Sequence, residues 1–207
     1  MVEKISFSSE VFNIEARFEK NSQEKGVVIT HPHPLYGGSM HNDVVVAIWR
    51  AYQNAGYTTL KFNFRGVGNS QGSYSDGVGE QEDVRAAVSF LANQGMVQID
   101  LAGYSFGSWV NALSIKDTIH VDNMIMISPP VAFIDFDSIS DLSSLELIVT
   151  GSRDDIAPAK LIQKSYHRWN PKARSELIEG ADHFYGGYLD KLEALLISHL
   201  ESRKKED

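Results

Sequence analysis

The sequence predicts an α/β protein: a mostly parallel, doubly wound sheet of about eight strands, with an antiparallel hairpin at the N-terminus and no cap domain. Three observations predict this fold class. The chain opens with two short segments in which apolar and polar residues partly alternate. After Lys25, short apolar runs are separated by longer amphipathic stretches. These runs are apolar on both faces, as is typical of parallel strands that helices cover on both sides.

The elements can be placed in order along the chain. Segments 2–8 and 11–18, with a polar break at Ser9-Glu10, predict the hairpin. Further strands are expected at 27–30, 58–64, 97–102, 124–127, 145–150 and 175–178. Helices are expected at 43–55, 79–94, 106–116, 159–169 and 188–202, because their apolar residues recur every three or four positions. This order is that of a doubly wound sheet, in which ligands bind beyond the carboxyl ends of the strands.

The composition narrows the class of protein. The 207 residues include 27 Asp and Glu against 19 Lys and Arg, which gives a formal net charge of −8. An acidic chain is poorly suited to phosphate backbones, so nucleic acid is not an expected partner. The chain has no cysteine, and no apolar run is long enough to span a membrane. We expect one domain over residues 1–207, in the cytoplasm and without a membrane partner, while the oligomeric state stays open.

A candidate nucleophile stands between an expected strand and an expected helix. Residues 103–107 read Gly-Tyr-Ser-Phe-Gly, and G-x-S-x-G in that context is the sharp turn that exposes a reactive serine. The N–H of Phe106, at the start of the helix, can donate to a developing oxyanion. A serine hydroxyl also needs a nearby base, which a third group must orient. The pattern therefore predicts Ser105 as nucleophile and implies a base and an acid elsewhere.

Two later loops hold candidates for these groups. Asp154 and Asp155 follow the expected strand at 145–150, and His183 follows the expected strand at 175–178. The chain order is thus Ser, Asp, His, with each group at the carboxyl end of a strand. Of the seven histidines, only His183 stands in the loop after the last strand, at the position where the base is needed, so it is the expected base. The residues alone leave both aspartates open as the acid.

Taken together, these segments resemble the α/β-hydrolases, and in particular the small lidless group related to dienelactone hydrolases. The resemblance covers nearly the whole chain through residues 31–38, 64–70, 103–107, 151–158 and 182–184, and it rests on their order and spacing. The family pattern places the acid three residues after the glycine and four before the proline, which selects Asp154 over Asp155. The loop at 64–70 resembles the family's support for the nucleophile turn, so Arg65, Gly66 and Ser70 are expected to be scaffold.

The resemblance also implies that the loop at 31–38 supplies a second N–H for the oxyanion. Its two prolines have no N–H, so His33 and Leu35 remain as donors, and Leu35 is favoured. An alternative reading is a metal site that uses His31, His33 and His41, but no cluster of Asp, Glu or Cys stands nearby. A dinucleotide site at Gly66 to Gly72 fails because the third glycine falls one position late. No metal or organic cofactor is expected.

The prediction is therefore a serine hydrolase of the carboxylesterase type, EC 3.1.1, which cleaves small carboxylic esters or related acyl bonds through an acyl-enzyme on Ser105. About sixteen residues, 129–144, join two expected strands, which is too short for a lid, so the expected partner is a small acyl substrate. Acyl transfer or perhydrolysis by the same groups, and a non-catalytic binding module, are the alternatives. Aromatic residues that could line the pocket, or else belong to the core, are Tyr36, Phe106, Tyr185 and Tyr188.

Overall fold

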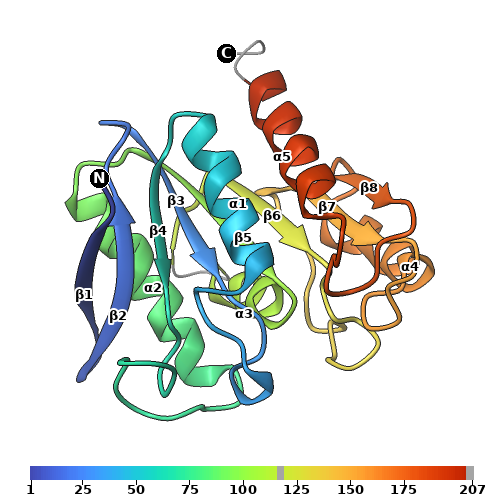
Figure 1. The fold of residues 1–207 in the computed structure, drawn as a ribbon. Coiled ribbons are helices and arrows are strands. Elements are labelled where there is room, and N and C mark those ends of the chain that lie inside the picture. Colours follow the sequence, from blue (N-terminus) through green and yellow to red (C-terminus); the bar gives the residue numbers. More distant parts are fainter. Residues whose placement is uncertain (116–118, 204–207) are drawn as a thin grey trace.

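The computed structural model describes residues 1–115 and 119–203. Eight strands form one sheet in the order β1-β2-β4-β3-β5-β6-β7-β8 (Figure 1). The first strand pairs antiparallel with the second and the second antiparallel with β4, while all other neighbours are parallel. The strands are β1 (Glu3–Ser9), β2 (Phe12–Glu19), β3 (Lys25–Thr30), β4 (Thr58–Phe62), β5 (Gln98–Tyr104), β6 (Asn123–Ile127), β7 (Leu145–Gly151) and β8 (Arg174–Ile178).

Helices cover both faces of the sheet and enclose two apolar cores. The helices are α1 (Asp43–Asn54), α2 (Val78–Asn93), α3 (Phe106–Ser114), α4 (Ala159–Trp169) and α5 (Leu189–Arg203), with a short 3-10 helix η1 (Pro34–Tyr36). Apolar residues of α1 and α5 pack on one face, and those of α2, α3 and α4 pack on the other (Figure 1). Within the described residues no helix is long and apolar enough to cross a membrane.

The predicted fold class is confirmed, and the differences lie at element ends. The hairpin turn falls one residue later than the polar break suggested, because Ser9 pairs with Phe12 and leaves Glu10-Val11 as the turn. The expected strand 58–64 ends at Phe62 in the structure. The expected helix 106–116 is helical to Ser114, and its last residue, 116, lies outside the described residues. The connector 129–144 contains no helix or strand, as a lidless chain requires.

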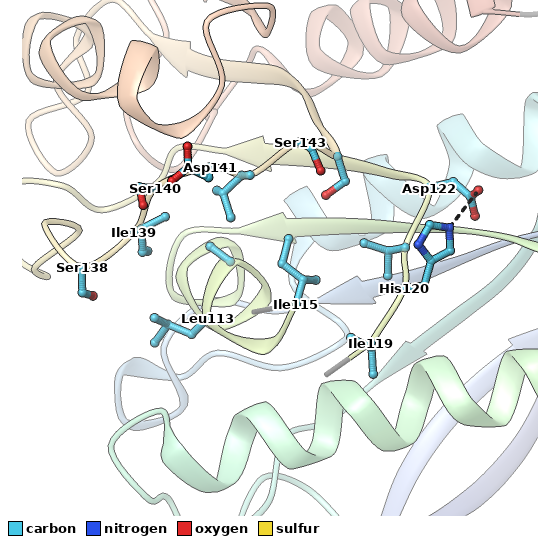
Figure 2. Close-up of a pocket in the computed structure, with 14 residues that line it drawn as sticks. Leu113, Ile115, Ile119, His120, Asp122, Ser138, Ile139, Ser140, Asp141 and Ser143 are labelled. Atoms are coloured by element: carbon cyan, nitrogen blue, oxygen red, sulfur yellow. Dashed lines mark ion pairs between the residues drawn. The ribbon is translucent and has the colours of Figure 1, made fainter. Parts of the chain in front are cut away.

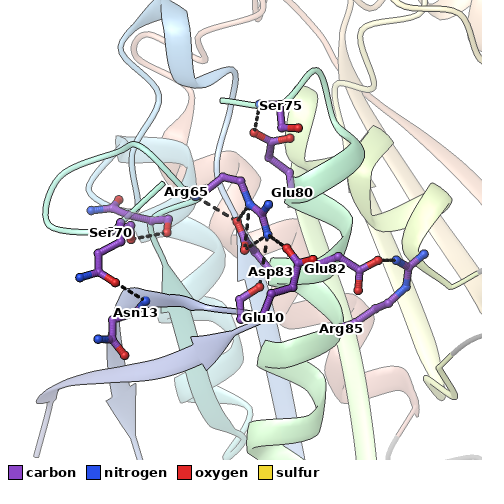
Figure 3. A network of polar contacts seen from close by, with 12 residues as sticks. Glu10, Asn13, Arg65, Ser70, Ser75, Glu80, Glu82, Asp83 and Arg85 are labelled. Atoms are coloured by element: carbon purple, nitrogen blue, oxygen red, sulfur yellow. Dashed lines mark hydrogen bonds and ion pairs between the residues drawn. The ribbon is translucent and has the colours of Figure 1, made fainter. Parts of the chain in front are cut away.

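The loop after β4 is fixed by a network of polar contacts (Figure 3). Arg65 donates from Nη2 to Asp83 Oδ1 at 2.9 Å and to Glu10 Oε2 at 3.0 Å, so it joins α2 to the hairpin turn. Its backbone N–H also donates to Asp83, at 3.0 Å. Ser70 Oγ closes the loop by donating to the carbonyl of Asn63 at 2.7 Å. These contacts hold the loop in place, which is the structural role expected for Arg65 and Ser70.

Candidate active site

Ser105 stands in the tight turn between β5 and α3. Its backbone has φ 53° and ψ −121°, a conformation that costs a residue with a side chain of the order of 1–3 kcal/mol. Two hydrogen bonds hold the turn: the N–H of Ser105 donates to the carbonyl of Ile127 at 2.9 Å, and its carbonyl accepts from the N–H of Ser108 at 2.9 Å. The strained residue is therefore fixed by a neighbouring strand and by the first turn of α3.

The two glycines of the motif are required by close packing. A Cβ atom on Gly103 would lie 2.6 Å from the backbone nitrogen of Ser108. A Cβ atom on Gly107 would lie 2.6 Å from Thr30 Oγ1 and 2.8 Å from the carbonyl oxygen of His31. Both distances are too short for non-bonded atoms, so only glycine lets α3 come this close to β3 and β5.

The structure brings Ser105, His183 and Asp154 into one hydrogen-bonded series. Ser105 Oγ lies 3.0 Å from His183 Nε2, and His183 Nδ1 lies 3.0 Å from both carboxylate oxygens of Asp154. All three residues are buried. Because an ionised carboxylate only accepts, Nδ1 carries the ring hydrogen and Nε2 is left to accept from the serine hydroxyl. This is the arrangement in which an imidazole can act as a general base toward a serine.

The structure distinguishes the two candidate acids. Asp154 Oδ1 also accepts the N–H groups of Ile156 at 2.9 Å and Ala157 at 2.7 Å. Burial raises the pKa of Asp154, but the hydrogen bond and charge of His183, with the Ala157 amide, outweigh it and leave the pKa below its usual range. Asp155 is exposed to solvent. Only Asp154 is placed to orient the histidine.

Aromatic residues around the series belong mainly to the core. Phe106 and Tyr185 are fully buried, and the Tyr185 hydroxyl is hydrogen-bonded to Ser128 Oγ at 2.9 Å. Tyr188 is half-buried and Tyr36 is exposed. Sequence reasoning missed Tyr104, whose hydroxyl donates to the carbonyl of His183 at 2.9 Å and so fixes the loop that carries the base. Tyr104 directly precedes Ser105 in the G-x-S-x-G motif, and this position is the sequence feature that could have pointed to it.

The loop at 31–38 presents a different amide from the one favoured by the sequence. The N–H of Leu35 donates to His33 Nδ1 at 3.2 Å, so it is already engaged. The N–H of His33 and that of Phe106 have no acceptor among the described residues. The His33 ring packs against the Phe106 ring with centroids 4.8 Å apart, which places the two residues side by side. The geometry therefore favours His33 over Leu35 as the second donor.

His31 fastens this loop to the sheet. Its Nε2 accepts the N–H of Phe64 at 3.0 Å, and its Nδ1 donates to the carbonyl of Pro32 at 2.6 Å. Burial lowers the pKa of His31 to about 4, so the ring is neutral at pH 7. With both ring nitrogens engaged, His31 is not available as a metal ligand, and the described residues form no group of three or more His, Cys, Asp or Glu that could hold an ion.

A cavity of about 470 Å³ lies away from this series (Figure 2). Residues from 112–115, 119–122 and 138–144 line it. It adjoins the residues just before β6, whereas Ser105 follows the carboxyl end of β5, and none of the three residues of the series contributes to its lining. The cavity therefore has no part in the chemistry of Ser105.

Known proteins share both the fold and the length of this chain. No family model matches it. A solved structure described as an alpha-beta serine hydrolase homologue from Coxiella burnetii is 34% identical, with a TM-score of 0.88, and covers 96% of this chain and 97% of its own. The chain belongs to the α/β serine hydrolases. This confirms the family resemblance, while the narrower likeness to dienelactone hydrolases stays a prediction.

Two further proteins are similar to this hydrolase over most of its length. A lidless α/β serine hydrolase from Xanthomonas campestris is 27% identical, with a TM-score of 0.88, over 98% of this chain and 94% of its own. An uncharacterised protein of Rickettsia prowazekii is 34% identical over 194 residues, which is 88% of this chain and 82% of the relative. The lidless relative agrees with the short connector at 129–144.

The buried histidine predicts a pH dependence of stability. The folded-state pKa of His31 is about 4, below its ordinary value near 6.5, so between these values only the unfolded chain binds the proton. Stability should therefore fall as pH falls from 7 to 5, by about 2 kcal/mol from this residue. His31→Gln should be less stable at pH 7 because it loses two hydrogen bonds, yet it should lose about 2 kcal/mol less between pH 7 and 5.

Urea unfolding at both pH values checks this expectation. His120→Gln is the control, because the His120 side chain is 88% exposed and should leave the pH dependence unchanged. An equal loss of stability between pH 7 and 5 in the wild type and in His31→Gln would contradict the assignment of a buried, neutral His31.

Proposed function

We propose that residues 1–207 form one cytoplasmic hydrolase domain that cleaves small carboxylic esters through an acyl-enzyme on Ser105. The observation that carries this proposal is the buried series Ser105 Oγ, His183 and Asp154, with 3.0 Å between the serine oxygen and the imidazole nitrogen. The series stands on a strained turn whose conformation needs two glycines. Strain held by packing at a reactive group supports a functional role for that group.

In the first half-reaction Ser105 Oγ attacks the ester carbonyl and its proton passes to His183 Nε2. The negative charge of Asp154 stabilises the imidazolium that forms and keeps Nδ1 protonated. The N–H of Phe106 and that of His33 donate to the developing oxyanion. When the tetrahedral intermediate collapses, the carbon–oxygen bond to the alcohol breaks, and His183 returns the proton to the leaving alcohol. Ser105 is left acylated.

In the second half-reaction a water molecule replaces the alcohol. His183 takes a proton from the water as its oxygen attacks the acyl carbonyl, and the same two N–H groups bind the oxyanion. Collapse breaks the bond to Ser105 Oγ, which recovers its proton from His183, and the carboxylic acid leaves. Atoms and charges balance without a metal or an organic cofactor.

The surroundings of the site support a short acyl group. The connector at 129–144 does not form a lid, and two aromatic side chains next to the site lie open to solvent. Phe184, which contacts the His183 ring, is 68% exposed, and Tyr36, which contacts the His33 ring, is 87% exposed. An open surface removes only part of a long acyl chain from water, so extra methylenes gain less than the ~0.8 kcal/mol that full burial gives each.

Replacing the nucleophile should abolish the reaction. Ser105→Ala should lower kcat by about 10⁴ to 10⁶ toward a short ester and prevent labelling by a fluorophosphonate, because Ser105 Oγ is the hydrogen-bond partner of His183 Nε2 among the described residues. Hydrolysis of p-nitrophenyl acetate and probe labelling measure both effects. A variant that is still labelled would show that the nucleophile is another residue.

The acid should be distinguished by two neighbouring substitutions. Asp154→Asn should fold but favour the wrong tautomer of His183, which lowers kcat by up to about 10⁴ near neutral pH. Asp155→Asn is the matched control and should retain activity, because its exposed side chain does not touch the histidine. Both variants are assayed at pH 7.5 with one short ester, and circular dichroism checks that they are folded. Loss of activity in Asp155→Asn alone would overturn the choice of acid.

Acyl chain length tests the proposed substrate class. With p-nitrophenyl esters of two to twelve carbons, kcat/KM should fall steeply beyond about six carbons, because no lid encloses a longer chain. Labelling by the fluorophosphonate together with a strong preference for the twelve-carbon ester would retain the hydrolase chemistry and reject the short-acyl substrate class.

A further inference from the structure

Three basic residues stand side by side on three adjacent strands. Lys4 of β1 is paired with Arg17 of β2, and Arg17 is paired with Lys61 of β4. Residues that are directly opposite in antiparallel pairs point to the same face of the sheet, where like charges destabilise the pairing. We call Lys4, Arg17 and Lys61 the cation row. The chain as a whole has a net charge of −8, yet these three positive charges lie together. A negative charge placed among them would reduce their mutual repulsion.

The carboxylates beside the cation row compensate only part of its charge, because Glu15 forms an ion pair with Arg17 alone. Glu15 accepts from Asn63 Nδ2 at 2.9 Å and from the N–H of Asn69 at 3.0 Å, and it lies 3.6 Å from Arg17 Nη1. Glu19 binds the N-terminal amine at 3.1 Å and Gln53 of α1. Neither glutamate forms an ion pair with Lys61. The row therefore keeps an excess of positive charge.

Lys61 is the least compensated member of the row. The residue is 5% exposed, and its ammonium has no hydrogen-bond acceptor or carboxylate partner among the described residues. Instead the ammonium lies over the Trp49 ring, 4.7 Å from the ring centroid. Burial, with the charges of Arg17 and Arg50, lowers the pKa of Lys61 to about 8. The ammonium is not itself among the fully buried atoms without a partner, so a bound anion can reach it and supply the missing negative charge.

Lysine and arginine can protect the edge of a sheet from pairing with another chain, but this role does not explain all three members of the cation row. Lysine on an edge strand discourages pairing with other chains, and β1 is an edge strand, so this explains Lys4. Arg17 and Lys61 lie on inner strands. Helix α1 packs on β4, β3 and β5, and in Figure 1 it leaves the same face of β1 and β2 uncovered. Arg50 at the edge of α1 adds a fourth cation to this open face.

We propose that the cation row and Arg50 bind a small anion that carries a diphosphate group. Neighbouring strands lie about 4.8 Å apart, so the row presents three cations over roughly 10 Å, a span that suits two linked phosphates better than one carboxylate. Arginine and lysine are the side chains that recognise phosphate oxygens, the first as a planar fork and the second as a point charge. The site lies on the helix-α1 face of the sheet and uses none of the residues of the Ser105 series.

Calorimetric titration of the wild-type protein with sodium pyrophosphate tests the proposal. We expect binding that weakens as NaCl rises from 0.1 to 0.5 M. Lys61→Met and Arg17→Gln should each weaken it about tenfold or more, whereas Ser105→Ala should leave it unchanged. Lys191→Met is the matched control, because the ammonium of Lys191 also lies over an aromatic ring, 5.0 Å from the centroid of Tyr188, but outside the row.

Parallel titration with ADP identifies the source of the diphosphate. Tighter binding of ADP than of pyrophosphate would indicate a nucleotide, and equal binding would indicate that the diphosphate group alone is recognised. If Lys61→Met does not fold, Lys4→Gln and Arg17→Gln carry the test, because the Lys4 side chain is exposed and the Arg17 side chain is only partly buried. No binding of pyrophosphate at 0.1 M NaCl, or binding that Lys191→Met weakens as much as Arg17→Gln does, would overturn the proposal.

Discussion

The close approach of α3 to the sheet is the constraint on which the site depends. Gly107 leaves room for Thr30 and the carbonyl of His31, so the first turn of α3 lies directly against the end of β3. Ser105 must then adopt a positive φ, and its hydroxyl projects toward the loops that carry His183 and Asp154. The same approach sets the N–H of Phe106 beside the loop at 31–38. A side chain on Gly103 or Gly107 would push α3 away from the sheet. That movement would displace both Ser105 Oγ and the N–H of Phe106.

The surrounding loops are fixed by buried hydrogen bonds that begin far away in sequence. His31 accepts from the backbone N–H of Phe64, and the Tyr104 hydroxyl donates to the carbonyl of His183. Each bond satisfies a polar group that burial would otherwise penalise, so each loop has one preferred conformation. Precise placement of the reactive atoms is thus supplied by neutral and polar residues that take no part in proton transfer.

Much of the fold and most of the site could be predicted from the sequence, because local patterns report them. Runs apolar on both faces indicate buried parallel strands, and the glycines around Ser105 indicate a sharp turn. What the sequence could not provide depends on the register of the strands or on which acceptor each loop amide finds. The amide of Leu35 is engaged by a ring two residues away, and the choice between His33 and Leu35 needed that geometry. The cation row is invisible without the pairing of β1, β2 and β4.

The order of the three reactive residues along the chain has a consequence for biosynthesis. A ribosome adds Ser105 first, Asp154 next and His183 last, and the base is followed by α5, whose residues pack with α1 in one core. Folding during synthesis proceeds from the N-terminus, so the turn and its oxyanion donors can form while the general base is still missing. A nascent chain therefore cannot assemble the Ser105, His183 and Asp154 series until β8 and the loop after it have been translated. Assembly of the series would then report synthesis as far as residue 183 rather than folding of the first half of the sheet.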